Sequence, residues 1–178
     1  LATLAVADVF GTHGPHYWGP NAATLPEAAL TDDSFNYLFV GAATTMLVLW
    51  LGFAGTGAFR RGRLLLSAVL VLALLYMLGR YTPFFAPVFH WLPGIDLFRR
   101  PVDASFVLLI ALALLSGHLL ADYVRDGLPR LRLMPGILVA TGVTAVVTSA
   151  LVFSARSGHA NAALLALAKA GGVFAVTA

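Results

Sequence analysis

The apolar residues of this chain are gathered into long blocks, which short stretches of charge, proline and glycine separate. Blocks of this kind are typical of bilayer-spanning helices, because about 20 apolar residues at roughly 1.5 Å each cover the hydrocarbon core. The pattern predicts an all-α, polytopic transmembrane bundle in which residues 1–178 form a single membrane domain. About five spans are predicted, namely Phe35–Gly55, Leu64–Gly79, Ala104–Ala121, Gly136–Phe153 and Ala162–Ala178.

Two longer polar segments interrupt the apolar blocks and are predicted to be loops. Residues 10–34 are rich in glycine, proline and polar side chains, and Tyr17 and Trp18 are residue types that favour the water–lipid boundary. Residues 80–103 contain four prolines. Each proline lacks an N–H and restrains the residue before it, so an ordinary span cannot continue here. The aromatic residues near Pro83–Trp91 predict a short helix lying in the interface.

The placement of the arginines predicts the orientation of the chain. Two short turns, residues 60–63 and 125–132, carry three arginines each, whereas the other side spreads four arginines over longer loops with acidic residues. The positive-inside rule places the two arginine turns in the cytoplasm. The outer side then receives loops 10–34 and 80–103, and a short loop expected at Ser154–Asn161.

The composition supports the membrane class and narrows the partners. Hydrophobic residues make up 60% of the chain and charged residues 11%, whereas a soluble domain carries about a quarter charged residues. The net charge of +3 is scattered without a basic run, which argues against a nucleic-acid partner. The chain starts without methionine and ends in an apolar run, so we expect an internal or C-terminal-side fragment of a longer protein.

Metal chemistry finds little support in the sequence. The chain has no cysteine, which excludes disulfides and thiolate metal sites. His13 and His16 have the spacing of a metal-binding pair, but Gly14 and Pro15 between them favour a flexible turn and no third ligand is evident. No metal is assigned, and the cofactor is left unknown.

Arg99 and Arg100 are the leading candidates for binding chemistry, because they precede a predicted span at the level of a lipid phosphate. A guanidinium group matches phosphate in a bidentate fork better than an ammonium group does. The alternative is that both arginines anchor the chain in the interface and pair with Asp96 or Asp103. Asp103 also precedes the helix predicted from Ala104, and capping that helix is its favoured role over contacting a sugar.

Aromatic side chains supply further candidates. His90 and Trp91 belong to the predicted interfacial helix, which either lies against lipid or lines a groove for a carrier lipid. Tyr17 and Trp18 are candidates for an aromatic platform under a sugar ring. Lys169 stands within the last apolar run, and snorkelling to the surface is favoured over a buried functional role.

One series of motif residues consists of Gly79, Tyr81, Thr82, Pro83, Leu92, Pro93, Gly94, Leu97, Phe98, Arg99, Pro101 and Ser116–Gly117. In this order they resemble the G-x-YTP segment, short helix, LPG-x-x-LFR-x-P segment and alanine- and leucine-rich span of the YfhO-type family of bacterial polytopic membrane proteins. The N-terminal series consists of Phe10, Gly11, Tyr17, Trp18, Gly19, Tyr37 and Gly41. Roughly the first two thirds of the chain carry the resemblance.

The resemblance implies a multi-pass glycosyltransferase of the GT-C architecture in the bacterial cytoplasmic (inner) membrane. Such an enzyme moves a sugar from a polyprenyl-phosphate carrier to an outer-face acceptor, so the implied partners are the lipid-linked sugar and membrane lipids. The family's catalytic carboxylate lies in a first outer loop that we expect outside this chain, so Asp8, Asp32 and Asp33 are not assigned that role. The rival functions are a non-catalytic transporter module, for which charged or broken helices at mid-membrane would be expected, and a scaffold without a ligand.

Overall fold

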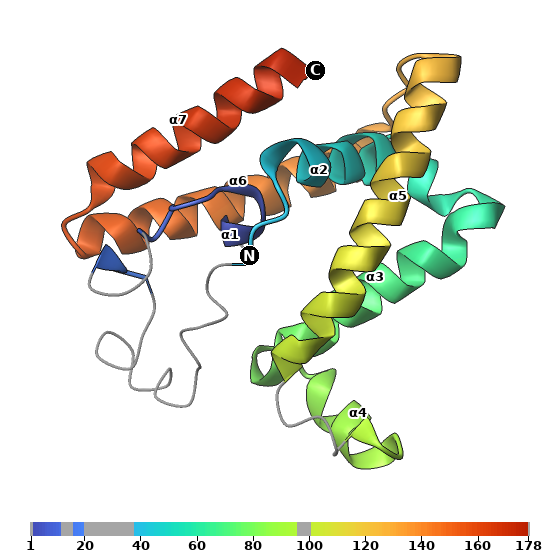
Figure 1. Ribbon diagram of the computed structural model, residues 1–178, viewed down its shortest axis with the longest axis horizontal. Helices are drawn as coiled ribbons and strands as arrows, with labels where there is room; N and C mark the ends of the chain where they lie inside the picture. The colour runs from blue at the N-terminus through green and yellow to red at the C-terminus, as the bar shows by residue number, and fades with distance from the viewer. Residues whose placement is uncertain (1, 12–15, 20–37, 96–100, 178) are drawn as a thin grey trace.

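The computed structural model describes residues 2–11, 16–19, 38–95 and 101–177, and this part of the chain is helical without a strand (Figure 1). The predicted all-α class is therefore confirmed. The helices are α1 (Ala2–Ala5), α2 (Ala42–Leu47), α3 (Leu64–Met77), α4 (Phe85–Trp91), α5 (Ser105–Asp126), α6 (Leu133–Arg156) and α7 (Ala160–Thr177). A π-helical segment, Val48–Ala54, continues α2, and 3-10 turns stand at Gly57–Phe59, Arg61–Arg63, Gly79–Tyr81 and Pro101–Ala104.

Two of the described helices are long and apolar enough to cross a membrane. One is α5 together with the turn before it, Pro101–Asp126, and the other is α6. They contain the predicted spans Ala104–Ala121 and Gly136–Phe153. Pro135 is accommodated in the first turn of α6, where the N–H that proline lacks would have no partner inside the helix.

The first predicted span, Phe35–Gly55, is wrong at its start. Residues 38–41 are not helical, and α2 begins only at Ala42, because Gly41 adopts a left-handed φ of 103°. The N–H of Val40 instead donates to the carbonyl of Leu4 in α1 at 3.0 Å. The helical stretch from Ala42 to Ala54 covers only about 20 Å, which is less than the hydrocarbon thickness of about 30 Å.

The other two predicted spans also differ in length from the helices observed. The helix α3 has 14 residues and ends at Met77, two residues before the predicted boundary at Gly79. The helix α7 begins at Ala160, two residues before the predicted start, and its apolar part is Ala160–Val173. The five-span arrangement stays a prediction.

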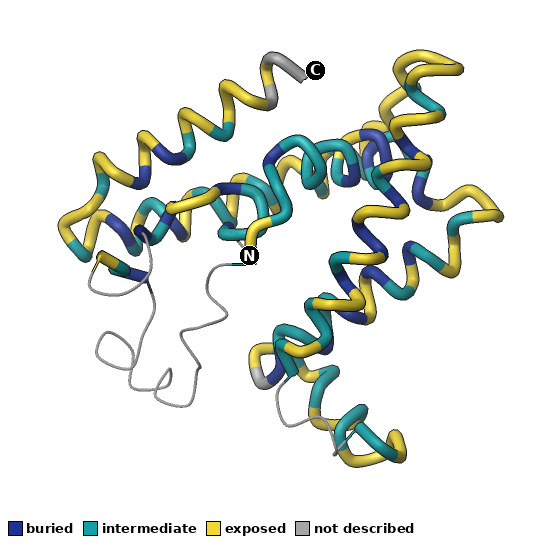
Figure 2. The backbone as a smooth tube through the Cα atoms, viewed as in Figure 1, coloured by how far each residue is buried: buried dark blue, intermediate teal, exposed yellow. Residues whose placement is uncertain are grey.

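The main core lies where α3 and α5 pack on each other and on the π-helical segment (Figures 1 and 2). It includes Leu70 from α3 and Leu115 and Leu119 from α5, all buried. A methyl group at Gly57 would stand 2.7 Å from the Cδ2 atom of Leu119. Glycine at this position therefore lets the turn after the π-helical segment press directly on α5.

A second, smaller core joins the N-terminal segment to α6 and α7. It contains Val9, which is fully buried, Ala150 from α6 and Ala166 from α7. Because α6 also contacts the π-helical segment, this second core is attached to the first. In Figure 1, α6 and α7 run side by side, with the N-terminal segment beside them.

The helix α4 confirms the short helix predicted near Pro83–Trp91, although it begins at Phe85. The ring of Phe85 lies 5.4 Å from that of Tyr76 in α3 and 5.4 Å from that of Phe89. Trp91, in contrast, is 86% exposed. Aromatic rings thus attach one side of α4 to α3, while Ala86, His90 and Trp91 are exposed.

Candidate functional site

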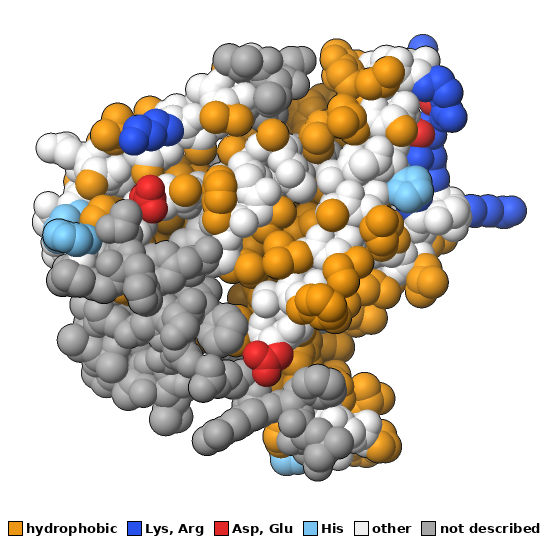
Figure 3. All heavy atoms as spheres, in the orientation of Figure 1, with side chains coloured by type: hydrophobic (Ala, Val, Ile, Leu, Met, Phe, Trp, Pro, Cys, Tyr) orange, Lys and Arg blue, Asp and Glu red, His pale blue; other side chains and the backbone are white. Residues whose placement is uncertain are grey.

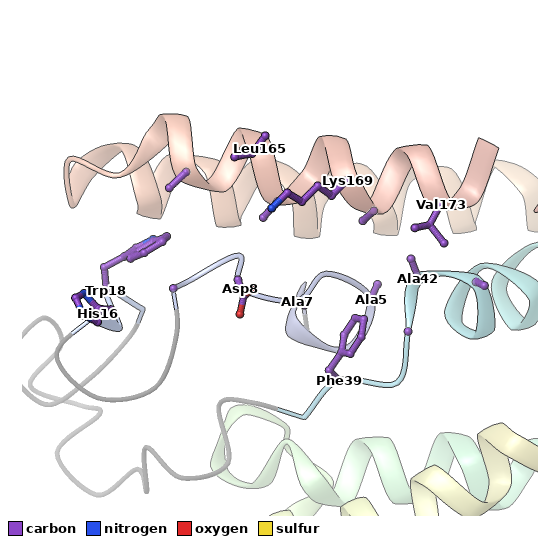
Figure 4. Close-up of a pocket in the computed structure, with 16 residues that line it drawn as sticks. Ala5, Ala7, Asp8, His16, Trp18, Phe39, Ala42, Leu165, Lys169 and Val173 are labelled. Carbon is purple, nitrogen blue, oxygen red and sulfur yellow. The ribbon is translucent and has the colours of Figure 1, made fainter. Parts of the chain in front are cut away.

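A cavity of about 450 Å³ lies between the N-terminal segment, the residues around the start of α2, and α7 (Figure 4). Most of its wall is alanine and glycine, and its charged and aromatic lining residues include Asp8, His16, Trp18 and Lys169. We call it the lysine cavity. Its volume falls in the range of small-molecule sites, about 300–1,000 Å³.

Lys169, the only lysine in the sequence, gives the cavity its positive charge. Its ammonium group reaches from α7 toward the N-terminal segment in Figure 4. Within the described part of the chain Lys169 forms no ion pair. Asp8 lines the same cavity, but its carboxylate points away from α7. A cation without a counter-ion among the described residues offers a binding group to an anionic ligand.

The N-terminal segment that forms the cavity floor folds back through a tight turn. Asp8 has a φ of 58°, in the left-handed region that aspartate tolerates better than most residues. The carbonyl of Asp8 accepts a hydrogen bond from the N–H of Gly11 at 2.9 Å. A side chain at Gly11 would collide with the ring of Trp18 and the carbonyl of His16. Glycine therefore permits the close approach that brings Trp18 to the cavity.

Trp18 is held in place by contacts with the end of α6 and the start of α7. Its ring stacks on that of His159, with centroids 4.6 Å apart and planes 6° from parallel. Its Nε1–H donates to the hydroxyl of Ser154 at 3.3 Å, and Ser154 in turn donates to the carbonyl of Val9 at 3.5 Å. The backbone N–H of Trp18 also donates to the carbonyl of Phe10 at 2.9 Å. Two contacts of the indole and one of its backbone thus position Trp18 before any ligand binds.

A second cavity of about 590 Å³ adjoins the first. It lies between the N-terminal segment, α2, the π-helical segment and α6, and Thr45 is the one polar side chain among the described residues that line it. We call it the apolar cavity. Ala5, at the end of α1, lines both cavities, so the two are neighbours. The pair offers an apolar volume next to a volume that carries a cation and an aromatic ring.

The two residues of the predicted aromatic platform line different cavities. Trp18 lines the lysine cavity, whereas Tyr17 lines a smaller cavity of about 70 Å³ that shares Asp8, Gly11 and Phe39 with it. A common Tyr17–Trp18 platform stays a prediction.

The predicted site in residues 80–103 lies partly outside the described residues, which exclude Asp96, Arg99 and Arg100. Of the described candidates, His90, Trp91 and Asp103 are exposed, and none lines the lysine cavity or the apolar cavity. Pro101 lies beside Gly79, at the end of α3 opposite Arg63. Gly79 and Pro101, on either side of this segment, thus lie at the end of the molecule predicted to face outward.

The capping role predicted for Asp103 is wrong. The helical conformation begins two residues earlier, in the 3-10 turn Pro101–Ala104, and proline favours such a first turn through its fixed φ. Asp103 therefore lies inside the turn. Ala104 occupies the cap position of α5, and no side chain makes a capping hydrogen bond there.

The contacts of Ser154 and His159 with Trp18 were missed, because the sequence predicts a loop over Ser154–Asn161. In the structure α6 continues through Arg156, and Ser154 is fully buried. One signal was present in the sequence. Ala150 and Ser154 are small residues four positions apart, a spacing that places both on one face of a helix, and both are buried.

The two arginine turns meet at the other end of the molecule, as their predicted common side requires. Asp122, just past the apolar stretch of α5, accepts bonds from Arg60 at 2.6 Å and Arg63 at 2.8 Å. Arg125 reaches Asp122 at 3.4 Å and Asp126 at 2.9 Å. The hydrogen bond from Arg63 lowers the pKa of Asp122; partial burial opposes this effect, and the nearby arginine charges add to it. These contacts tie the turn before α3 to the end of α5.

The described residues contain no group of three or more histidine, aspartate or glutamate side chains that could hold a metal ion. No family model, no curated protein and no solved structure matches the chain. The resemblance to the YfhO-type family therefore rests on the motif residues alone.

Proposed function

We propose that the chain is part of a membrane glycosyltransferase that transfers a sugar from a polyprenyl-phosphate carrier to an acceptor outside the cytoplasm. In this proposal the chain spans the bacterial inner membrane about five times, with α2 and its π-helical continuation, α3 and α7 as the shorter spans. The lysine cavity and the apolar cavity together hold the carrier. Arg99 and Arg100 keep their predicted role of binding phosphate.

The observation that carries the proposal is that Ala5 lines both cavities, which are therefore neighbours. A polyprenyl phosphate has a long hydrocarbon tail and an anionic head, so it needs an apolar volume and a cation side by side. The apolar cavity matches the tail, because its lining is almost entirely hydrocarbon. Lys169 matches the head, because its ammonium has no counter-ion among the described residues.

Trp18 supports a ligand that carries a sugar. Sugar rings present C–H faces that pack on aromatic rings, and an indole held by Ser154 and His159 loses little freedom when it receives one. The ring stands on the same cavity as Lys169. A sugar linked through phosphate would reach both groups at once.

The test measures the binding of polyprenyl phosphate and of neutral polyprenol to the full-length protein in nanodiscs. Lys169→Met should weaken polyprenyl-phosphate binding about tenfold, because a hydrogen bond to a charged group contributes roughly 1.5–3 kcal/mol. Binding of the neutral polyprenol should stay the same. Lys169→Arg should retain most of the affinity, since it keeps the charge.

Arg156→Gln is the matched control, because Arg156 is exposed at the end of α6 and lines neither cavity. Equal affinity of the wild type and Lys169→Met for the phosphate would refute the role of the lysine cavity. Sugar transfer from the lipid-linked donor in vesicles of the full-length protein tests the reaction itself. Paired replacement of Arg99 and Arg100 by glutamine in the same assays tests their separate role.

A non-catalytic transporter or scaffold module is the second candidate, and two observations favour transport. The helix that starts at Ala42 changes to a π-helix over Val48–Ala54, a distortion frequent at functional sites. Lys169 also places a charge within an apolar helix. Movement of a labelled lipid or solute across proteoliposomes, without sugar transfer, would select this function over the enzyme.

A further inference from the structure

The end of the molecule formed by the turn before α3 and the turn between α5 and α6 is strongly basic. It carries Arg60, Arg61, Arg63, Arg125, Arg130 and Arg132, with Asp122 and Asp126 as its only acidic residues in 57–65 and 122–134, so that its net charge is four positive. We call this surface the arginine face. Figure 3 shows blue side chains gathered along this edge, with red ones between them.

Half of these arginines are not neutralised by the carboxylates. Arg60, Arg63 and Arg125 share Asp122 and Asp126. Arg61, Arg130 and Arg132 are exposed, and they form no ion pair with a described residue. The face therefore presents three guanidinium groups with free donors, which match phosphate oxygens.

The two turns of the arginine face are fixed to each other. The backbone N–H of Arg132 donates to the carbonyl of Ala54 at 3.1 Å. A methyl group at Gly55 would meet the Cγ atom of Pro129 at 2.8 Å, so the two turns are in close contact. The bonds from Arg60 and Arg63 to Asp122 add a third link. The free arginines thus project from a held framework, so little backbone freedom is lost on binding.

Exposed apolar side chains surround the arginines. Leu65, Val124, Leu128, Leu133 and Met134 are between 69% and 79% exposed. A soluble acidic partner would satisfy the charges but leave these side chains in contact with water. A phospholipid satisfies both, because its phosphate meets the guanidinium groups and its acyl chains cover the apolar residues.

We propose that the arginine face binds the phosphate groups of anionic phospholipids at the surface of the bilayer. Arg61, Arg130 and Arg132 contact the phosphates, while Asp122 and Asp126 hold the remaining three arginines as a framework. This site lies at the start of α6, whereas Trp18 and the turn into α7 lie at its end. It therefore lies at the far end of α6 from Trp18 and the lysine cavity, whereas the apolar cavity extends to this end, because Phe59 and Pro135 line it.

The experiment titrates the detergent-solubilised full-length protein with short-chain phosphatidylglycerol and, separately, with phosphatidylcholine, and counts bound lipids by native mass spectrometry. The triple variant Arg61→Gln, Arg130→Gln, Arg132→Gln should bind phosphatidylglycerol at least about tenfold more weakly, with phosphatidylcholine binding unchanged. Arg156→Gln, at the opposite end of α6, should bind both lipids as the wild type does. Equal melting temperatures establish that the variants are folded.

Three results would overturn the proposal. One is unchanged phosphatidylglycerol binding by the triple variant, and the second is an equal loss of both lipids. The third is displacement of phosphatidylglycerol by a soluble glutamate-rich peptide that binds as tightly, which would make an acidic protein the partner. Lys169→Met should retain phosphatidylglycerol binding, so the outcome is independent of carrier binding in the lysine cavity.

Discussion

The α3–α5 region and the α6–α7 region are built from similarly apolar helices, yet they are buried to very different extents (Figure 2). In the apolar part of the α5 span 28% of residues are buried, against 6% in α6. The large side chains that are fully buried include Leu108 and Leu115, both from α5. Apolar composition therefore predicts which segments avoid water, but it does not predict which of them pack against other helices.

The well-buried α3–α5 region forms the framework of the molecule, and the less buried α6–α7 region contains the cavities. The α3–α5 region has a continuous core that the bonds to Asp122 close at one end. The lysine cavity and the apolar cavity lie instead along α6, α7 and the N-terminal segment, where packing is sparse. A ligand can enter a sparsely packed region at little cost, because no close-packed side chains must separate.

Among the substitutions considered, Leu115→Ala should lower the stability of the α3–α5 region most strongly. Leu115 is fully buried between α3, α5 and the π-helical segment, so truncation leaves a cavity and should lower the free energy of unfolding by about 2–4 kcal/mol. The adjacent Leu114 is 51% exposed, and Leu114→Ala should change stability by only about 0.5 kcal/mol or less. Thermal unfolding in detergent measures both. Equal effects would show that α5 is not packed as described.

Asp122→Asn should have the next largest effect. The substitution removes the charge that Arg60, Arg63 and Arg125 share, and Arg63 is only 13% exposed on its side chain. Because Arg60 and Arg125 are 56% and 70% exposed, solvent screens much of the loss, and we expect about 1–2 kcal/mol. Asp126→Asn is the control, since the ion pair of Asp126 among the described residues is with exposed Arg125.

The pH dependence of the Asp122 contribution has a definite sign. The pKa of Asp122 is lower in the folded chain than its ordinary value of 3.8, mainly because Arg63 donates a hydrogen bond to the charged form. Its contribution is therefore fully present above that ordinary value and is lost as the pH falls through the lower folded value. The wild type and Asp122→Asn should differ in melting temperature at neutral pH and converge on acidification. A constant difference would assign the effect to packing.

The sequence predicts the two long helices well because each is set by local properties. An uninterrupted apolar run with polar ends predicts Ala104–Ala121 and Gly136–Phe153 without knowledge of their neighbours, and the observed helices contain both ranges. The sequence predicts α2 poorly, because the start of this helix is set by a φ of 103° at Gly41 and by a hydrogen bond from Val40 to distant Leu4. Neither has a local signature that distinguishes Gly41 from an ordinary glycine in a span.

The candidate site was predictable only in part for a similar reason. Lys169 and Trp18 stand out individually, because a charge in an apolar run and a tryptophan in a loop are unusual. Their meeting in one cavity depends on the fold-back of the N-terminal segment onto α7, which joins residues about 150 positions apart. Periodicity carries no information about such pairings.

Ser154→Ala should have the smallest effect on stability, and it tests what holds the cavity end of α6 together. Where the α3–α5 region relies on large buried side chains, the cavity end of α6 relies on one hydroxyl that joins Trp18 to Val9 through bonds of 3.3 and 3.5 Å. Bonds of this length contribute little, so stability should fall by only about 0.5–1 kcal/mol. The ring of Trp18 should nevertheless lose its fixed orientation on His159, which near-ultraviolet circular dichroism and acrylamide quenching detect in a variant with Trp50 and Trp91 replaced by phenylalanine. Ser149→Ala is the matched control, because Ser149 lies on α6 with its hydroxyl bonded only within that helix. If Ser154→Ala leaves the spectrum of Trp18 unchanged, the stacking on His159 alone positions the indole.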